Sequence, residues 1–160
     1  MSKAALEAVK KKFGSEIVDE HALHGDETLV VKPGKLTQIA EFLRDDPALA
    51  MDMLTDVTAV DFLMQGRELR FEVVYHFNSM TKFKRLRLKV QVGGDEPEVP
   101  SLTGLYKSAN WMEREVWDMY GIKFTDHPDL RRILLYEEFE GHPLRKDYPK
   151  QKRQPLVRRP

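Results

Sequence analysis

Apolar residues recur at helical spacing in two separate stretches near the start of the chain. Spacings of three and four residues place such side chains on one face of a helix. They are Leu6, Val9 and Phe13 in the first stretch, and Leu36, Ile39, Ala40 and Leu43 in the second. Ser2 is suited to cap the first predicted helix and Gly14 to end it, and Asp46-Pro47 ends the second. The pattern therefore predicts two amphipathic helices.

Strands are predicted where apolar and polar residues alternate. The alternation is strict over residues 68–78 and continues in the next segment. The predicted strands, in chain order, are residues 16–23 and 27–32, which form a hairpin, and then residues 52–63, 68–78 and 86–92. After them, residues 93–100 predict an acidic loop and residues 101–108 a short helix.

The order of these elements predicts an α+β fold. Alternating strands indicate a sheet with one apolar face, because parallel strands buried on both faces would be continuously apolar. We expect a two-layer domain in which helices cover a mixed, mostly antiparallel sheet, followed by an extended C-terminal arm. The expected boundaries are residues 1–140 for the domain and 141–160 for a basic arm that docks on a partner.

The last quarter of the chain interleaves charged and aromatic side chains. A helix is predicted over residues 111–120, with Asn110 as its N-cap and Gly121 at its end. Arg114 and Asp118 are four residues apart, a spacing that allows an ion pair, although in the less favourable order along the helix. Residues 133–136 predict a short buried run. Most of this quarter lacks a regular strand or helix pattern, so other groups must satisfy its backbone.

This quarter resembles the signature of one family of NADH-quinone oxidoreductase components, the C subunits, which are the 30-kilodalton-type subunit of respiratory complex I. The runs that carry the resemblance are Glu113-Arg114-Glu115, Asp118-Met119-Tyr120-Gly121-Ile122, His127-Pro128-Asp129-Leu130-Arg131-Arg132-Ile133-Leu134 and Gly141-His142-Pro143-Leu144-Arg145-Lys146-Asp147-Tyr148-Pro149. The preceding part of the chain resembles the family more loosely, in length and element order.

The resemblance implies a structural subunit with no catalytic site of its own. Family members lie in the quinone-reducing module of the peripheral arm of a proton-pumping enzyme, on the cytoplasmic side of the bacterial inner membrane or the equivalent matrix side. They pack chiefly against the D subunit and lie near the B and I subunits. Electrons pass from NADH through FMN and iron–sulfur clusters to quinone in the other subunits, so no cofactor is expected in this chain.

Fifteen motif residues are carried over as expected interface and structural positions rather than as catalytic groups. They are Glu113, Arg114, Glu115, Asp118, Tyr120, Gly121, His127, Pro128, Arg131, Arg132, His142, Pro143, Arg145, Asp147 and Tyr148.

Composition narrows the possible functions. The chain has 26 Lys and Arg against 26 Asp and Glu, and this zero net charge argues against a general attraction to nucleic acid or anionic lipid. It has no cysteine, so it cannot hold an ordinary iron–sulfur cluster. No run approaches the ~18 apolar residues of a membrane span, and the N-terminus lacks the apolar core of a signal peptide. We therefore expect any membrane association to come through a partner.

The titratable residues of the motif do not suggest an active site. Glu113 and Glu115 point to different faces of a helix, so they are expected to be solvated or interface charges. No glycine-rich loop accompanies Arg131 and Arg132, which favours ion pairs with carboxylates over a phosphate clamp. His127 and His142 each precede proline, and each predicts a turn with a hydrogen-bonded ring rather than a metal ligand.

An RNA-binding module is the alternative function. Its support is a basic strand over residues 82–89, which contains Phe83, and a basic tail. The tail's cations are Arg145, Lys146, Lys150, Lys152, Arg153, Arg158 and Arg159, against a single acid, Asp147. A solvated sheet face, or one that faces an acidic neighbour, is the favoured interpretation of the strand. An acidic groove on a partner protein is the favoured target of the tail.

Overall fold

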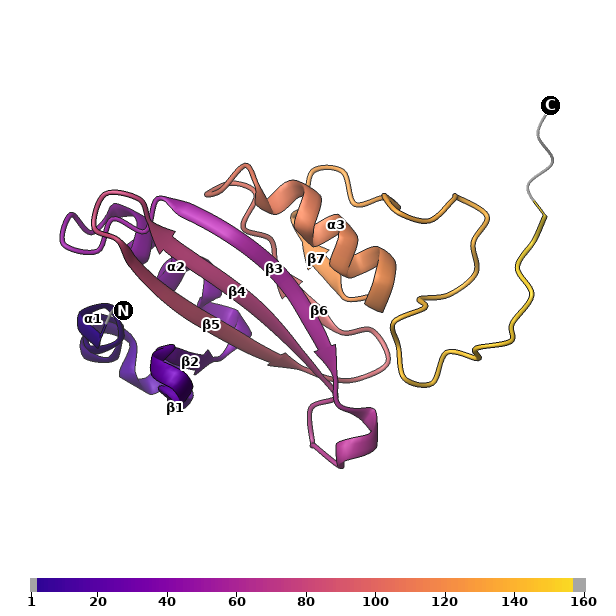
Figure 1. Cartoon of the computed structure of the whole chain (residues 1–160), viewed down its shortest axis with the longest axis horizontal. Helices are drawn as coiled ribbons and strands as arrows, with labels where there is room; N and C mark the ends of the chain where they lie inside the picture. The colour runs from indigo at the N-terminus through magenta and orange to yellow at the C-terminus, as the bar shows by residue number, and fades with distance from the viewer. Residues whose placement is uncertain (1–2, 157–160) are drawn as a thin grey trace.

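A five-stranded sheet forms the centre of the computed structural model, which describes residues 3–156 (Figure 1). Its strands, in spatial order, are β1 (Ile17–His21), β2 (Thr28–Val31), β5 (Lys84–Val92), β4 (Phe71–Ser79) and β3 (Met53–Asp61). Strands β2 and β5 are parallel, and the other neighbours are antiparallel. The predicted α+β fold with a mixed, mostly antiparallel sheet is therefore confirmed.

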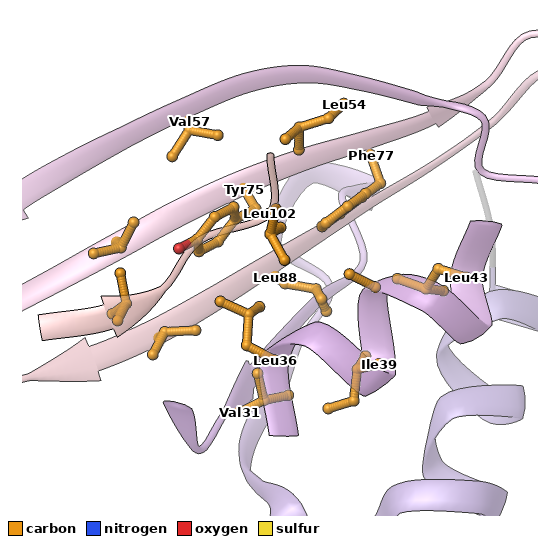
Figure 2. Close-up of a cluster of buried hydrophobic side chains, with 14 of the residues drawn as sticks. Val31, Leu36, Ile39, Leu43, Leu54, Val57, Tyr75, Phe77, Leu88 and Leu102 are labelled. Carbon is orange, nitrogen blue, oxygen red and sulfur yellow. The ribbon is translucent and has the colours of Figure 1, made fainter. Parts of the chain in front are cut away.

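Three helices contribute to one hydrophobic core on one face of this sheet. They are α1 (Lys3–Phe13), α2 (Leu36–Asp45) and α3 (Ala109–Tyr120). The strand register pairs Tyr75 with Leu88, and both side chains lie in the core on the face of the sheet that α2 covers (Figure 2). The opposite face carries polar side chains such as Arg87 and Lys89, which explains why β5 alternates so regularly.

Several predicted boundaries need correction. Strand β4 begins at Phe71, because residues 63–65 form a 3-10 turn and Gly66 takes a left-handed conformation. The predicted acidic loop contains a short strand, β6 (Glu98–Pro100), which pairs in parallel with β7 (Lys123–Thr125). The predicted cap at Ser2 lies outside the described residues.

The segment between β6 and α3 is also different from the prediction. Residues 101–108 form turns rather than a helix, since the Glu113 carboxylate binds Ser101 and the Leu102 amide at their start. Helix α3 then begins at Ala109, so Asn110 lies within the helix and is not its cap. Gly121 ends α3 as predicted.

Beyond β7, the described part of the chain has no further helix or strand. This segment first passes α3, then returns to the end of the sheet beside β3, and from there runs away from the domain as an extended arm (Figure 1). The prediction of a buried run over residues 133–136 is wrong: Leu134 is 62% exposed and its three companions are half-buried. The run turns its backbone amides, rather than its side chains, toward α3.

Candidate functional site

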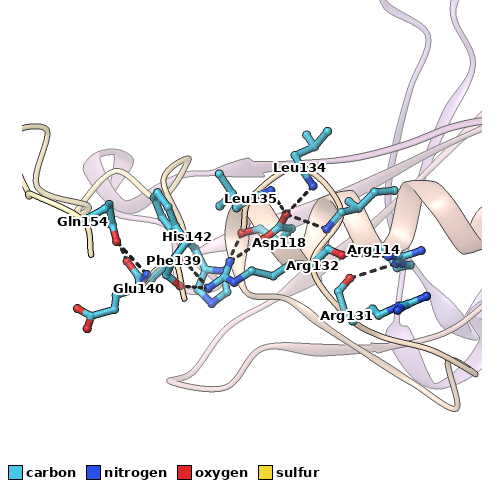
Figure 3. Close-up of polar contacts among 12 residues, drawn as sticks. Arg114, Asp118, Arg131, Arg132, Leu134, Leu135, Phe139, Glu140, His142 and Gln154 are labelled. Carbon is cyan, nitrogen blue, oxygen red and sulfur yellow. Dashed lines mark hydrogen bonds and ion pairs between the residues drawn. The ribbon is translucent and has the colours of Figure 1, made fainter. Parts of the chain in front are cut away.

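Asp118 holds the segment that follows β7 against α3. This residue has no solvent exposure. Its Oδ1 accepts a hydrogen bond from Arg132 at 2.6 Å, and its Oδ2 accepts from the amides of Ile133, Leu134 and Leu135 at 2.9–3.1 Å (Figure 3). One buried carboxylate thus takes the place of a strand ladder for three consecutive residues.

Two arginines extend this arrangement to backbone carbonyls. Arg114 donates to the carbonyls of Arg131 and Arg132 at 3.1 and 2.9 Å. Arg132 donates to the carbonyls of Phe139 and Gly141 at 2.7 and 3.1 Å. The pair that helical spacing allows between Arg114 and Asp118 is not the one formed, because the carboxylate is occupied by Arg132 and the amides. For Arg132, the predicted ion pair with a carboxylate is the contact with the buried Asp118.

Arg131 and Glu115 point outward. Arg131 pairs with Asp129 at 2.9 Å, and both side chains are more than half exposed, so this ion pair contributes little to stability. Glu115 is exposed on α3, as predicted for a solvated or interface charge. Exposure leaves both residues available to a partner.

Glu113 does not lie at the surface as expected. It has no solvent exposure, and its carboxylate accepts from Ser101 Oγ at 2.6 Å and from the Leu102 amide at 2.7 Å. Burial raises the pKa of Glu113 to about 7, although both hydrogen bonds oppose this shift. The prediction of an exposed Glu113 is wrong because residues 101–108, which were expected to be a helix, form turns that Glu113 binds.

Both histidines of the motif are hydrogen-bonded to backbone groups, as predicted for His-Pro turns. His127, before Pro128, donates from Nε2 to the Asn110 carbonyl at 3.2 Å and accepts the Asp129 amide at Nδ1. His142, before Pro143, donates from Nδ1 to the Asp118 carbonyl at 3.0 Å. Within residues 3–156, no group of three His, Asp or Glu side chains is arranged to bind a metal ion.

The first half of the C-terminal arm lies on the end of α3. The Leu144 amide donates to the Met119 carbonyl at 3.0 Å, and Arg145 Nε donates to the Tyr120 carbonyl at 2.5 Å. At Gly121, an added Cβ would lie 2.5 Å from His142 Cδ2, so glycine permits this close approach. Tyr148 stacks on the Phe139 ring with centroids 6.1 Å apart.

A second set of contacts fixes the arm to the sheet. Arg70 lies between two carboxylates: it binds Asp61 at 2.7 and 2.9 Å and Asp147 at 2.8 and 2.9 Å. Asp61 also accepts the Lys146 amide at 2.8 Å. Burial favours the protonated acid, but the bonds from Arg70, Lys146 and Leu63 outweigh it and lower the pKa of Asp61 to about 2. The boundary at residue 141 and docking of the arm on a partner remain predictions.

Sequence reasoning missed Asp61, Arg70 and Ser101. A signal for Asp61 was present, since it follows Val57 and Ala59 on the apolar side of β3. An acid at the end of an apolar stripe needs a partner. The partner of Asp61 is Arg70, which lies immediately before β4. The sequence pattern does not identify this residue as the partner.

Four exposed side chains of α3 and of the segment after β7 are candidates for contact with a partner, and we treat them together as a candidate docking face. We define this docking face as Trp111, Arg131, Leu134 and Leu144. Trp111 and Leu134 are each 62% exposed. A groove lined by residues of α3 and of the following segment, among them Trp117 and Leu135, lies beside them. Large exposed apolar side chains on a rigid surface are typical of protein interfaces.

The basic strand offers poor support for RNA binding. Arg85 and Arg87 both pair with Asp26, and Lys89 pairs with the buried Glu72 at 2.9 Å. These carboxylates belong to the same sheet face or its rim, so they neutralise the cations that a phosphate backbone would need. Arg85, Arg87 and Lys89 are therefore all engaged in ion pairs within the domain.

Comparison with known proteins identifies the family. Residues 29–154 match the family described as respiratory-chain NADH dehydrogenase, 30 Kd subunit. The NADH-quinone oxidoreductase C subunit of Roseiflexus sp. (strain RS-1) is 49% identical over 144 residues, which cover 90% of this chain and 82% of that protein. A C subunit of Rhizobium etli (strain CIAT 652), numbered 2 in that organism, is 45% identical over 141 residues, or 88% and 74% of the two chains.

Solved structures agree with this match. A trypsin-resistant fragment of Nqo5 superposes with a TM-score of 0.68 at 30% identity, over 79% of this chain and 99% of the fragment. A chain of the membrane-bound sulfane sulfur reductase, an archaeal respiratory membrane complex, has the same fold, with a TM-score of 0.76 at 18% identity over 93% and 86% of the two chains. No helix within residues 3–156 has the length and apolar character to cross a bilayer. The chain therefore belongs to the family of the 30-kilodalton subunit of respiratory-chain NADH dehydrogenase, the C subunit of NADH-quinone oxidoreductase.

Proposed function

We propose that this chain is a non-catalytic structural subunit in the quinone-reducing module of the peripheral arm of a proton-pumping NADH-quinone oxidoreductase. The observation that supports it most is the use of the motif's charged groups. Asp118, Arg114 and Arg132 bind backbone amides and carbonyls, so they shape an irregular surface instead of facing a substrate. A surface built in this way suits permanent docking.

The partners follow from the family and from the docking face. We propose that the docking face is covered by the D subunit, with the B and I subunits nearby, on the cytoplasmic side of the bacterial inner membrane or the equivalent matrix side. FMN and iron–sulfur clusters would lie in other subunits, and they would carry electrons from NADH to quinone. This chain contains no cysteine with which to ligate a cluster.

Co-purification from native membranes tests this proposal. The tagged chain, extracted with mild detergent, should be recovered in a large assembly that contains FMN, iron–sulfur clusters and NADH-to-quinone activity. Trp111→Ala should lower that recovery without changing the melting temperature of the isolated chain, since the Trp111 side chain is 62% exposed. Leu23→Ala, at a position 65% exposed in the loop between β1 and β2, is the control and should have no effect.

Two outcomes would contradict the proposal. One is recovery of the tagged chain as a free protein, and the other is its recovery bound to RNA. Equal recovery of the assembly with Trp111→Ala and with wild type would be consistent with membership of the assembly, but it would contradict the role assigned to the docking face.

A further inference from the structure

The turn between β4 and β5 exposes a large aromatic side chain. This hairpin tip comprises residues 80–83, between the paired residues Ser79 and Lys84. Phe83 is 89% exposed and Met80 is 59% exposed. Phe83 also has a φ of 52°, in the left-handed region that hairpin turns usually fill with glycine or asparagine. Neither its exposure nor its backbone conformation favours the stability of the isolated domain.

Side-chain hydrogen bonds hold the hairpin tip in one conformation. Asp52 Oδ1 accepts the Met80 amide at 2.9 Å, and Ser79 Oγ accepts the Lys82 amide at 3.1 Å. Phe83 is therefore presented by a fixed turn at the end of two long strands. A preorganised aromatic anchor loses little conformational freedom on binding, which is the property of an interface hot spot.

Positive charge surrounds these apolar side chains. Among the described residues, neither Lys82 nor Lys84 has a carboxylate partner, and the Lys84 ammonium donates to the Ala48 carbonyl at 3.2 Å. Farther along β5, Arg87 and Lys89 are both paired with carboxylates. Lys82 and Lys84 are thus cations without an ion pair among the described residues, although Asp52 binds the Met80 amide nearby, and a complementary surface would combine an apolar pocket with acidic residues at its rim.

The hairpin tip lies at the end of the sheet opposite the C-terminal arm (Figure 1). We infer that it is a second docking point, where Phe83 inserts into an acidic-rimmed apolar pocket on another protein subunit of the assembly. One aromatic side chain on a hydrogen-bonded turn suits a pocket of matching shape better than a fluid lipid surface. The inference rests on the proposed function for the nature of the partner, but it uses residues outside the docking face and outside the motif.

Photo-crosslinking in the assembled complex separates this inference from the proposed function. A photoreactive phenylalanine analogue is placed at position 83 in one chain and at position 111 in another. The inference predicts that position 83 crosslinks to a peptide of an oxidoreductase subunit that contains Asp or Glu beside apolar residues. Crosslinks from position 111 alone would overturn the inference and leave the proposed function standing. The absence of crosslinks to any subunit from both positions would overturn both.

A substitution with opposite effects on stability and assembly gives the second test. Asparagine tolerates the left-handed conformation, so Phe83→Asn should leave the melting temperature of the isolated chain unchanged or raise it. The same change should weaken association with the partner by about tenfold or more, the usual effect of losing an aromatic hot spot. Leu23→Asn, also at an exposed loop position, is the matched control.

Charge reversal tests the predicted rim. Lys82→Glu should lower recovery of the assembly, whereas Lys82→Gln should have a smaller effect. Unchanged recovery of both Phe83→Asn and Lys82→Glu would overturn the inference, as would crosslinking of position 83 to lipid or to a second copy of this chain.

Discussion

The carboxylate of Asp118 accepts four hydrogen bonds in a site closed to solvent, from one guanidinium and three consecutive amides. Burial by itself would favour the protonated acid. The bonds from the Leu135 amide, Arg132 and the other two amides outweigh burial, and they hold the pKa of Asp118 below its ordinary value. Asp118 is therefore ionised at neutral pH, and its charge is balanced by Arg132.

Replacement of Asp118 by asparagine tests the importance of this charge. Asp118→Asn leaves the Arg132 guanidinium in a largely buried site without its counter-ion and replaces one acceptor oxygen by an amide group. Because removal of one partner from a buried pair typically costs about 3–5 kcal/mol, we expect a loss of that order in the free energy of unfolding, measured with urea. Glu115→Gln, on the exposed side of α3, should change it by less than ~0.5 kcal/mol. Similar losses in both variants would contradict the assigned role.

Glu113 is the opposite case on the same helix. It lies at the core side of α3 without a cationic partner, and burial raises its pKa to about 7. In the unfolded chain a Glu titrates near pH 4.5. Between pH 4.5 and about 7, the Glu113 carboxyl is therefore protonated in the folded state and ionised in the unfolded state. Stability must therefore fall as the pH rises through this window.

Glu113→Gln should remove this pH dependence. Glutamine keeps an oxygen to accept the Leu102 amide but cannot ionise. We expect wild type to lose stability relative to the variant as the pH rises from about 5 to 7, by up to ~1.4 kcal/mol per pH unit. Urea unfolding at several pH values measures the difference, in which the histidines common to both proteins cancel. A difference that is constant with pH would show that Glu113 titrates normally.

At the scale of the element, the end of α3 matters because the arm rests on it. Gly121 has a φ of 72°, and its missing Cβ leaves room for His142 and Arg145. The helix therefore stops at a residue that serves two purposes: it permits a left-handed turn and it allows the arm to approach.

A pair of glycine substitutions separates these two purposes. Gly66 has a similar φ of 63° but no atom within 4 Å of an added Cβ. Gly66→Ala should therefore cost only the left-handed backbone term, roughly 1–2 kcal/mol. Gly121→Ala should cost more and should also release the arm, seen as faster amide hydrogen exchange at Leu144. Equal losses of stability in Gly66→Ala and Gly121→Ala would contradict close packing of the arm against Gly121.

Elements defined by their own periodicity were predictable from the sequence. The apolar stripe of α2 and the alternation of β5 lie within short windows, and the structure confirms both. The turns over residues 101–108, and with them the start of α3, were not predictable from local periodicity. They depend on the Glu113 carboxylate, which lies outside residues 101–108 and binds Ser101 and the Leu102 amide. Strand β6 was missed for a similar reason, since its partner β7 lies more than twenty residues later.

At the scale of the whole molecule, Arg70 joins parts of the chain that are far apart in sequence. Asp147 lies 77 residues after Arg70, and Lys146 lies 85 residues after Asp61. The pKa of Asp61 is lowered from 3.8 to about 2, so this contribution to stability is present above pH ~4 and is lost as the pH falls toward 2. The arm is thus fixed to the sheet throughout the neutral range.

Limited trypsin digestion tests this long-range contact. Arg70→Gln should accelerate cleavage after Lys146 by about fivefold relative to cleavage in β5, as expected for a loss of ~1 kcal/mol of local stability. Arg67→Gln is the control, because Arg67 pairs with Glu72 and stacks on Phe62, and it has no ion pair with residues 141–156. Equal acceleration of cleavage at all sites would indicate global unfolding, and it would contradict a local role of Arg70 in holding the arm.

The motif identified which residues shape the candidate site, but not how they pair. A contact between Arg114 and Asp118 would follow helical spacing, whereas the actual partners lie on a segment that has no period of its own. Asp61 and Arg70 stand outside the motif altogether, and nothing in their local sequence indicates their contact with the arm. Pairings of this kind depend on the finished path of the chain, which sequence patterns describe poorly.

The contacts of the arm also set the order in which the molecule can be completed. Its seat requires α3, with the Met119 and Tyr120 carbonyls, and the joined ends of β3 and β4, with Asp61 and Arg70. Contacts between residues so far apart in sequence generally form more slowly than local helix and hairpin contacts, because loop-closure entropy must be overcome first. During synthesis the sheet can therefore form first, and the arm can take its place only after residues 144–147 have emerged. A chain that stops before residue 142 would lack these contacts and present an unfinished surface, so a partner would meet the completed shape only after residues 142–147 are in place.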